Sequence, residues 1–325
     1  MTPEEFKKRC KGIIPVQYCP FTEEGELDLD GLKRNTQFLV DFAKNGKDLV
    51  IMTNGSTTEF YANSIEEQKM VMKKVVEVAG GKVPVVAGTS QAGTKETIKM
   101  TKYAEGIGVD CAMVVLPYYH TPTRDGMYQH YKKIAESAKI GIMIYNNPDV
   151  SGSLIDPALM KMLSKIDNIV AVKDNTPIID DYFLNSATVN PEDMVLINGR
   201  GEIQYVASAA YGFRYKGFVT WVGNFAPAQS YGVYEAVREK NFEKAEASLE
   251  KMLPLFRILG EFMKRRETVS IIPLAYRTNY MYMSVGKACM DLVGLSGGLL
   301  KLPMENLKDE EKNELKKVLE EIGII

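Results

Sequence analysis

The chain has few histidines and cysteines, and both shortages limit the chemistry that it can carry out. Its 325 residues include only two histidines, His120 and His130. A metal site built from several histidines is excluded, and a Ser-His-Asp or Cys-His mechanism would depend on one of these two residues. The four cysteines have neither a CxxC pair nor the spacing of zinc ligands. If the protein is an enzyme, we therefore expect Tyr, Lys, Ser, Thr or a carboxylate to carry its protons.

Long apolar segments and an excess of one charge are also missing. No stretch approaches the roughly 18 apolar residues of a membrane span, and the first ten residues lack the apolar centre of a secretion signal. The 40 Lys and Arg residues against 42 Asp and Glu residues give a net charge of −2, without a long basic run. This composition argues against membrane insertion, secretion and nucleic-acid binding. Together with the scattered cysteines it predicts a cytoplasmic protein.

The chain does contain a series of short apolar runs rich in β-branched residues, each ending at polar residues, Gly or Pro. Such runs are typical of buried parallel strands. Helical segments separate them, with start signals such as the capping box from Ser64 to Glu67 and the Asp156-Pro157 pair. The eight runs cover residues 12–16, 48–53, 83–87, 111–116, 141–145, 169–173, 194–198 and 217–221. Eight strand-helix units predict an α/β fold, a (β/α)8 TIM barrel over residues 1–240.

The strand signal stops after about residue 240, and the rest of the chain has a helical pattern. We expect helices over residues 242–262, 269–290 and 306–322. No linker-like composition separates this part from the barrel, so residues 241–325 are predicted to form a helical region packed on it. A doubly wound sheet is the alternative, but it usually has fewer strands and a Gly-rich first turn, which is absent here.

Polar side chains at the strand ends are the first candidates for function, because the active site of such a barrel lies at the carboxyl ends of the strands. Lys173 ends the sixth run and Tyr145 ends the fifth. Burial in the barrel mouth would lower the pKa of a lysine and make it a nucleophile towards ketones. Tyr145 could relay protons to the carbinolamine that forms. Taken alone, Lys173 could instead extend outwards or pair with Asp174, and Tyr145 could be a rim aromatic.

A turn rich in hydroxyl groups follows the second run. Gly55, Ser56, Thr57 and Thr58 offer hydroxyls and backbone N–H groups that could bind a carboxylate. Clusters of this composition are usually only turns. The functional interpretation depends on this turn lying at the same end of the barrel as Lys173 and Tyr145.

Five short motifs occur in order along the chain. They are G-S-T-T-E at residues 55–59, P-Y-Y at 117–119, Y-N-N-P at 145–148, V-K at 172–173 and K-L-P at 301–303. Each motif is weak alone, but their order and their places at the strand ends are specific. Together they resemble the dihydrodipicolinate synthase / N-acetylneuraminate lyase family of class I, Schiff-base-forming aldolases, nearly from end to end.

The resemblance implies a role for each matching residue. Lys173 would form an imine with pyruvate or a related 2-oxo acid, and Tyr145 would move protons. This imine chemistry would require no metal and no organic cofactor. Thr57 is expected among the catalytic residues and, with Ser56, at the substrate carboxylate. Tyr119 matches a tyrosine that reaches into the site of a neighbouring subunit, which implies a homodimer or a homotetramer.

Three departures from the family pattern bear on the substrate. Val150 stands where the synthases carry an arginine for the carboxylate of the aldehyde, which argues against synthase activity. Gly199 and Glu202 resemble the sugar-binding segment of sialic acid lyases, although Gly201 replaces an acidic residue there. Trp221 should shorten the pocket or make it more apolar. Arg200 could meet a distal carboxylate, but a solvent-facing arginine is the simpler interpretation.

The favoured function is retro-aldol cleavage of a 2-keto-3-deoxy sugar acid or a sialic-acid-like compound, with release of pyruvate. One alternative is an imine-based dehydratase or deaminase of the same family. A second is dihydrodipicolinate synthase (4-hydroxy-tetrahydrodipicolinate synthase) despite the missing arginine. A sensor that binds a 2-oxo acid without turnover is the non-enzymatic alternative.

Overall fold

The computed structural model describes residues 1–44, 46–209, 212, 214–266, 269–277 and 279–325. Its strands are β1 (Gly12–Pro15), β2 (Ile51–Thr53), β3 (Val85–Gly88), β4 (Cys111–Val115), β5 (Gly141–Asn146), β6 (Ile169–Asp174), β7 (Val195–Asn198) and β8 (Tyr215–Thr220). All eight pair in parallel in the order β1-β8-β7-β6-β5-β4-β3-β2. Bridges from Ile13 to Leu49 and from Val16 to Met52 join the first strand to the second and close the barrel. The predicted (β/α)8 TIM barrel is confirmed.

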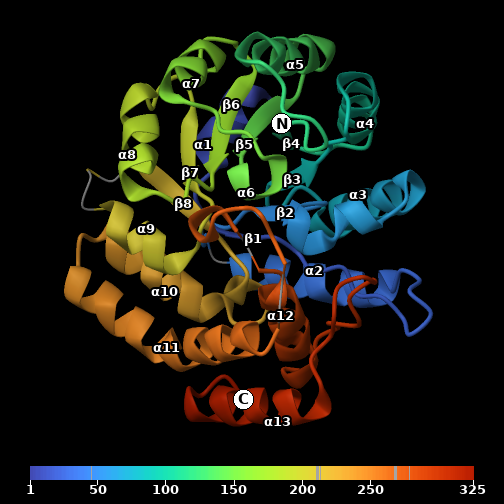
Figure 1. Ribbon diagram of the computed structural model, residues 1–325, viewed down its shortest axis with the longest axis vertical. Helices are drawn as coiled ribbons and strands as arrows, with labels where there is room; N and C mark the ends of the chain where they lie inside the picture. Colours follow the sequence, from blue (N-terminus) through green and yellow to red (C-terminus); the bar gives the residue numbers. More distant parts are fainter. Residues whose placement is uncertain (45, 210–211, 213, 267–268, 278) are drawn as a thin grey trace.

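Helices surround this barrel and extend beyond it at the end of the chain (Figure 1). They are α1 (Pro3–Arg9), α2 (Leu29–Ala43), α3 (Ile65–Ala79), α4 (Thr94–Gly106), α5 (Arg124–Ser137), α6 (Pro148–Ser151), α7 (Pro157–Leu163), α8 (Ile179–Thr188), α9 (Glu202–Ala209), α10 (Pro227–Arg238), α11 (Phe242–Lys264), α12 (Met281–Leu292) and α13 (Asp309–Glu321). Short 3-10 turns are η1 (Ser56–Thr58), η2 (Phe60–Ala62), η3 (Val222–Asn224) and η4 (Leu274–Tyr276). The expected capping box is present, because the Ser64 hydroxyl accepts from the backbone N–H of Glu67 and the Glu67 carboxylate accepts from that of Ser64.

The strands divide their side chains between two apolar layers. Alternate residues point into the barrel or outwards to the helices, as the period of a β-strand requires. The inner layer is closed at the amino-terminal end of the barrel by α1, whose Phe6 is fully buried among inward-facing residues such as Ile14 and Met143. The opposite end is left open, and the inward-facing residues there are Tyr145 and Lys173.

The C-terminal helices pack on one side of the barrel, with α11 against α10 and α13 beneath α11 and α12 (Figure 1). Two bidentate ion pairs, Arg265 with Glu314 and Arg266 with Glu311, tie the end of α11 to α13. Among the described residues, no helix combines the length and the apolar character that crossing a membrane requires.

The helix expected over residues 269–290 is wrong in its first half. Helix α12 begins only at Met281, and the described residues before it form no longer element than η4. Two physical causes account for this. Pro273 has no backbone N–H for a helical hydrogen bond, and the β-branched residues Val269, Ile271 and Ile272 are poor helix formers.

Candidate active site

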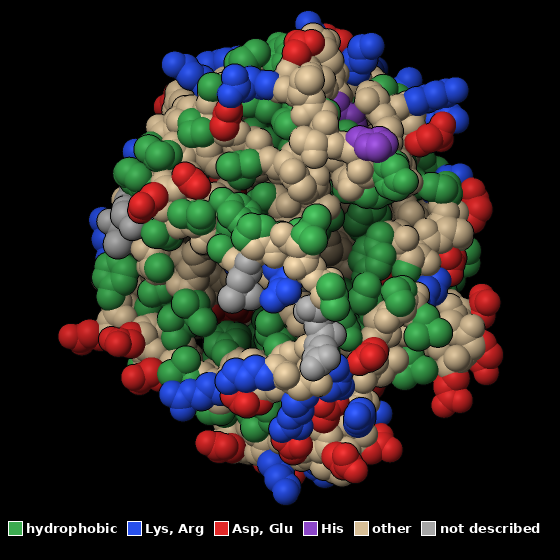
Figure 2. Space-filling view, in the orientation of Figure 1, with side chains coloured by type: hydrophobic (Ala, Val, Ile, Leu, Met, Phe, Trp, Pro, Cys, Tyr) green, Lys and Arg blue, Asp and Glu red, His purple; other side chains and the backbone are tan. Residues whose placement is uncertain are grey.

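A cavity of about 340 Å³ opens at the carboxyl ends of the strands. That size is typical of a site for a small molecule. A hollow is visible near the middle of the face shown in Figure 2, with hydrophobic side chains along its edges. Its lining brings together the following residues predicted from the sequence: Ser56, Thr57, Tyr145, Lys173, Gly199, Glu202 and Trp221.

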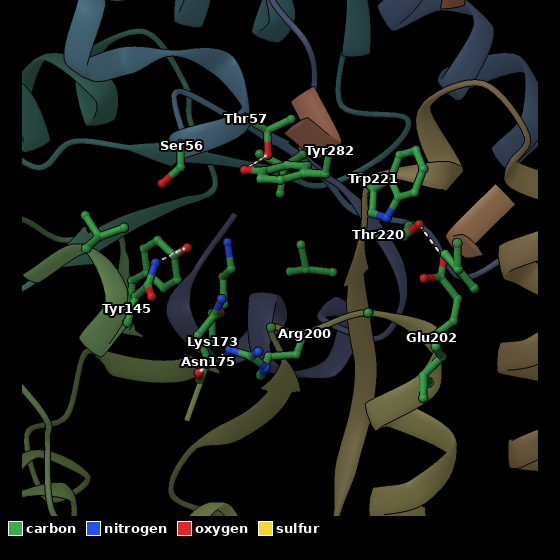
Figure 3. Close-up of a pocket in the computed structure, with 18 residues that line it drawn as sticks. Ser56, Thr57, Tyr145, Lys173, Asn175, Arg200, Glu202, Thr220, Trp221 and Tyr282 are labelled. Atoms are coloured by element: carbon green, nitrogen blue, oxygen red, sulfur yellow. Dashed lines mark hydrogen bonds between the residues drawn. The ribbon is translucent and has the colours of Figure 1, made fainter. Parts of the chain in front are cut away.

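Strand pairing places Lys173 beside Tyr145. The two residues are direct partners in the register of β5 and β6, so their side chains leave the sheet on the same face. The lysine Nζ lies 3.9 Å from the centroid of the tyrosine ring and 4.0 Å from the sulfur of Met52. Figure 3 shows the amine pointing up into the pocket. Only 3% of Lys173 is exposed, so the alternative in which it extends outwards is wrong.

The surroundings of Lys173 favour its neutral form. It makes no salt bridge to a described residue, and burial lowers its pKa from 10.5 to about 7. Asp174 is not its partner, because one Asp174 oxygen accepts from the backbone N–H and the hydroxyl of Thr176 and from the amide of Asn146. At neutral pH a large fraction of the amine is therefore unprotonated and able to attack a carbonyl carbon.

The phenol of Tyr145 is oriented by Asn147, which lies two residues further along the chain, just after β5. Its oxygen accepts a hydrogen bond of 2.7 Å from the side-chain amide of Asn147. The phenol proton is consequently left free for another partner. Burial raises the pKa of Tyr145, so the group stays protonated until a reaction demands its proton. This makes it suited to acid–base chemistry next to the amine.

The turn after β2 points two hydroxyls at the pocket. Asn54 and Glu59 flank it with left-handed backbone angles, at φ 50° and 57°, which turn the chain sharply at both ends. The Ser56 hydroxyl is buried and forms no hydrogen bond to a described residue, although it lies near enough to favour the Tyr145 phenolate. The Thr57 hydroxyl lies 3.3 Å from that of Tyr282. A ligand carboxylate could satisfy both.

The far wall of the pocket combines one carboxylate with an aromatic surface. One oxygen of the buried Glu202 carboxylate accepts hydrogen bonds of 2.6 Å from Thr220 and 2.7 Å from Ser230. Burial raises its pKa, and these hydrogen bonds oppose the rise. Trp221 packs against Phe256 beside it, with 6.3 Å between the ring centroids. Figure 3 shows this wall across the pocket from Lys173.

Gly199, directly after β7, also lines the pocket. Its N–H donates to the carbonyl oxygen of Asp174 at 2.8 Å. A Cβ atom at this position would lie 1.8 Å from the side-chain oxygen of Asn175. The same Cβ atom would lie 2.9 Å from the backbone oxygen of Asp174, so a larger residue would have to displace both groups.

Val150 and Arg200 stand at the rim of the same pocket. The guanidinium of Arg200 lies 3.5 Å from a carboxylate oxygen of Asp149 and 3.4 Å from the carbonyl oxygen of Asn175. Arg200 was expected to face solvent. Its side chain is partly exposed, and it also lines the pocket. A positive charge therefore stands at the rim of the pocket.

Tyr119 and both histidines lie outside this pocket. Tyr119 is 82% exposed, with its ring edge-on to that of His120. Its expected reach into a neighbouring copy stays a prediction. His130 is buried in α5 next to the Thr94 hydroxyl, and burial lowers its pKa to about 4. Among the described residues, no three His, Cys, Asp or Glu side chains gather to hold a metal ion.

The sequence motifs did not reveal Tyr282 or Asn147 as site residues. Asn147 lies within the Y-N-N-P motif, where its spacing of two residues from Tyr145 was a usable signal. Tyr282 lies in a helix without any motif, and only the packing of α12 against the barrel brings it to the pocket.

Comparisons with known proteins extend this local picture to the whole chain. The profile of the Dihydrodipicolinate synthetase family matches residues 9–322. A 4-hydroxy-tetrahydrodipicolinate synthase of Methanocaldococcus jannaschii is 31% identical over 316 residues, which are 97% of this chain and 99% of that protein. The crystal structure of dihydrodipicolinate synthase from Aquifex aeolicus has a TM-score of 0.82 at 29% identity and covers 97% of this chain and 98% of its own. YagE, an E. coli prophage protein of the same family solved in complex with pyruvate, has a TM-score of 0.83 at 25% identity, covering 97% and 99%.

Proposed function

The chain belongs to the dihydrodipicolinate synthetase family, and from that premise we propose that it cleaves a 2-oxo acid and releases pyruvate through an imine on Lys173. Its family makes it an enzyme of the class I aldolase type. The observation that carries the proposal is a buried lysine without a carboxylate partner, at a pKa of about 7. A related protein of the family has been solved with pyruvate bound, which supports pyruvate as the part of the substrate nearest to Lys173.

The proposed reaction uses the residues around the amine. The neutral amine of Lys173 attacks the C2 carbonyl carbon while Ser56 and Thr57 hold the adjacent carboxylate. Tyr145 protonates the hydroxyl of the resulting carbinolamine, which leaves as water and gives an iminium ion. The C3–C4 bond then breaks, its electrons move towards the iminium nitrogen, and the C4 hydroxyl gives its proton to the Tyr145 phenolate as the aldehyde forms. Protonation of the enamine at C3 and hydrolysis of the imine release pyruvate.

The far wall supports a hydroxylated substrate such as a 2-keto-3-deoxy sugar acid or a sialic-acid-like compound. The Glu202 carboxylate can accept hydrogen bonds from sugar hydroxyls, and Gly199 leaves room for the chain beneath them. A negatively charged Glu202 would repel a second carboxylate on the substrate. Trp221 limits the length of the tail and gives it an apolar face to lie against.

Dihydrodipicolinate synthase activity is the second candidate. The relatives with this name support it, as does the Arg200 guanidinium at the pocket rim, which could bind the carboxylate of a semialdehyde in place of the arginine missing at Val150. In that reaction the enamine of pyruvate attacks the aldehyde, which reverses the carbon–carbon step of the lyase.

The experiment begins with borohydride and pyruvate. Reduction of the imine should attach pyruvate irreversibly to Lys173, which mass spectrometry of the peptide detects. An untouched lysine, under conditions that label a known class I aldolase, would refute the imine and also leave the 2-oxo acid sensor as the better interpretation.

A substrate panel then separates the enzymatic candidates. Lactate dehydrogenase reports pyruvate released from 2-keto-3-deoxy acids or from N-acetylneuraminate, whereas a synthase consumes pyruvate only together with the semialdehyde. Loss of a sugar acid without release of pyruvate would instead identify a dehydratase or deaminase.

A further inference from the structure

The C-terminal region contributes a phenol to the pocket. Tyr282, in the first turn of α12, lines the cavity together with Lys173 and Tyr145. Figure 3 shows its ring across the pocket from the end of Lys173 and beside Thr57. Tyr282 is half-buried, and its ring faces the pocket. Protein surrounds its hydroxyl closely, and this burial raises the pKa of the phenol. A second protonated phenol is thus available within the same chain.

The hydroxyl of Tyr282 is paired with that of Thr57. The two oxygens are 3.3 Å apart, and either can be the donor. A pair of this kind can reverse its direction, since each hydroxyl both donates and accepts. It can therefore take up a proton on one side and give one up on the other.

Contacts at both ends hold this pair in place. Glu59, two residues after Thr57, forms a buried ion pair of 2.7 Å with Lys287, which lies on α12 five residues after Tyr282. Tyr18 donates a hydrogen bond of 3.2 Å to the backbone oxygen of Tyr282. A Cβ atom on Gly286 of the same helix would lie 1.8 Å from the Tyr18 hydroxyl, so glycine is needed for this close packing. The position of the phenol is thereby built into the fold.

We propose that Tyr282 is a catalytic acid–base residue that transfers the proton at C3 of the substrate, with Thr57 as its relay, within a single chain. Tyr145, next to the amine, serves the carbinolamine, and Tyr282 serves the carbon on the other side of the imine. This inference rests on the proposed function, because it assigns a step of that same imine chemistry. It removes the need for Tyr119 of a neighbouring copy to complete the relay.

The proton transfers balance without a further reactant. Tyr145 gives its proton to the departing hydroxyl and becomes a phenolate as the iminium ion forms. A C3–H bond of the iminium then breaks, its electron pair forms the enamine double bond, and the proton passes to the Tyr282 oxygen. Tyr282 passes its own proton to Thr57, and the Thr57 proton moves through the water released from the carbinolamine to the Tyr145 phenolate, which restores the phenol. The sum is conversion of carbinolamine into enamine and water.

Pyruvate alone is sufficient to test this assignment. In D2O, reversible enamine formation replaces the methyl protons of pyruvate by deuterium, which proton NMR follows, whereas borohydride trapping reports the imine only. Tyr282→Phe should slow the exchange by about 10²-fold, the lower end of the range for acid–base catalysis. The rate of trapping on Lys173 should change less than threefold, because imine formation does not use Tyr282.

Two further variants serve as controls. Tyr280→Phe removes a phenol from the N-terminal end of the same helix but outside the pocket, and it should leave exchange and trapping unchanged. Thr57→Val breaks the hydroxyl pair from the other side. Because Thr57 also holds the carboxylate, the variant is compared at saturating pyruvate, where it should slow exchange much more than trapping; this ratio carries the test if Tyr282→Phe does not fold. Tyr145→Phe should slow both exchange and trapping.

Three results would overturn the assignment. Exchange by Tyr282→Phe at the wild-type rate would show that the phenol is not used. An equal loss of trapping and exchange would assign it to imine formation instead. Loss of exchange in Tyr119→Phe with exchange retained in Tyr282→Phe would place the relay on a neighbouring copy. If the wild-type protein neither traps nor exchanges pyruvate, the proposed function itself fails, which distinguishes that outcome from the first three.

Discussion

Two buried lysines, Lys173 in the barrel and Lys287 in the C-terminal region, have very different groups around their amines. Lys173 on β6 is 3% exposed and Lys287 on α12 is 1% exposed. Lys287 Nζ lies 2.7 Å from a Glu59 carboxylate oxygen and donates to the carbonyl oxygen of Leu299. The Lys173 amine lies instead beside the Met52 sulfur and the Tyr145 ring, and it forms no salt bridge to a described residue.

The difference shows how burial can serve either chemistry or structure. A buried ammonium without a partner loses its hydration and gains little in return, so it gives up its proton and becomes a nucleophile. Burial also lowers the pKa of Lys287, but the charge of Glu59 opposes the change and holds the ammonium form. The paired lysine fixes the turn after β2 to α12, whereas the amine of Lys173 is left largely neutral near pH 7.

The largest expected effect is the loss of the reactive amine. Lys173→Ala should abolish trapping of pyruvate by borohydride and lower turnover by on the order of 10⁴-fold or more, because no other described group in the pocket can form the imine. Lys216→Ala, which removes an outward-facing lysine from β8, is the matched control and should retain both activities. Labelling that persists in Lys173→Ala would move the nucleophile to another lysine.

The same contrast predicts opposite changes in stability. Lys287→Met leaves the Glu59 carboxylate buried without its ammonium partner and should lower the free energy of unfolding by about 3–5 kcal/mol. Lys173→Met removes an ammonium that the fold does not compensate, and it should raise the free energy of unfolding by up to about 4 kcal/mol, since one pKa unit corresponds to about 1.4 kcal/mol. Urea denaturation of both variants measures the two changes.

The change of stability with pH provides a control for the Lys173 and Lys287 variants, because its direction depends on the lowered pKa of Lys173. Between pH 7 and 10.5 the unfolded chain binds a proton at Lys173 that the folded chain does not, so the wild type loses stability as the pH falls through this range. The advantage of Lys173→Met should therefore be greatest at and below pH 7 and vanish above pH 10.5. Adding Glu59→Gln to Lys287→Met should recover part of the lost stability. Equal destabilisation by both single variants would contradict the contrast.

The sequence alone predicted the barrel side of this comparison much better than the C-terminal side. Strand periodicity and punctuation are local properties, and they located every strand to within a few residues. Because Tyr145 and Lys173 each end a strand, the barrel topology was sufficient to bring them together. The retained motifs identified the family, which the comparisons confirm.

The C-terminal side depends on contacts between distant residues. The helix expected from residue 269 begins at Met281, since local periodicity did not register the effect of Pro273. The glutamate of the G-S-T-T-E motif received no role, because its partner Lys287 lies more than two hundred residues away in the sequence. Tyr282 was missed for the same reason. Such pairings follow from how α12 packs on the barrel, and the sequence carries no local sign of them.

The smallest effect is the pH dependence of imine formation, which tests the state of Lys173 directly. Only the neutral amine attacks a carbonyl carbon, so the rate of trapping should rise as the pH increases through about 7 and then level off. For a pKa of about 7, the neutral fraction and the trapping rate should grow by about tenfold between pH 6 and pH 8. An ordinary, solvated lysine would still be gaining reactivity near pH 10. A trapping rate that continues to climb tenfold per pH unit up to pH 10 would therefore show that Lys173 is held charged as Lys287 is, and the distinction between the two lysines would be lost.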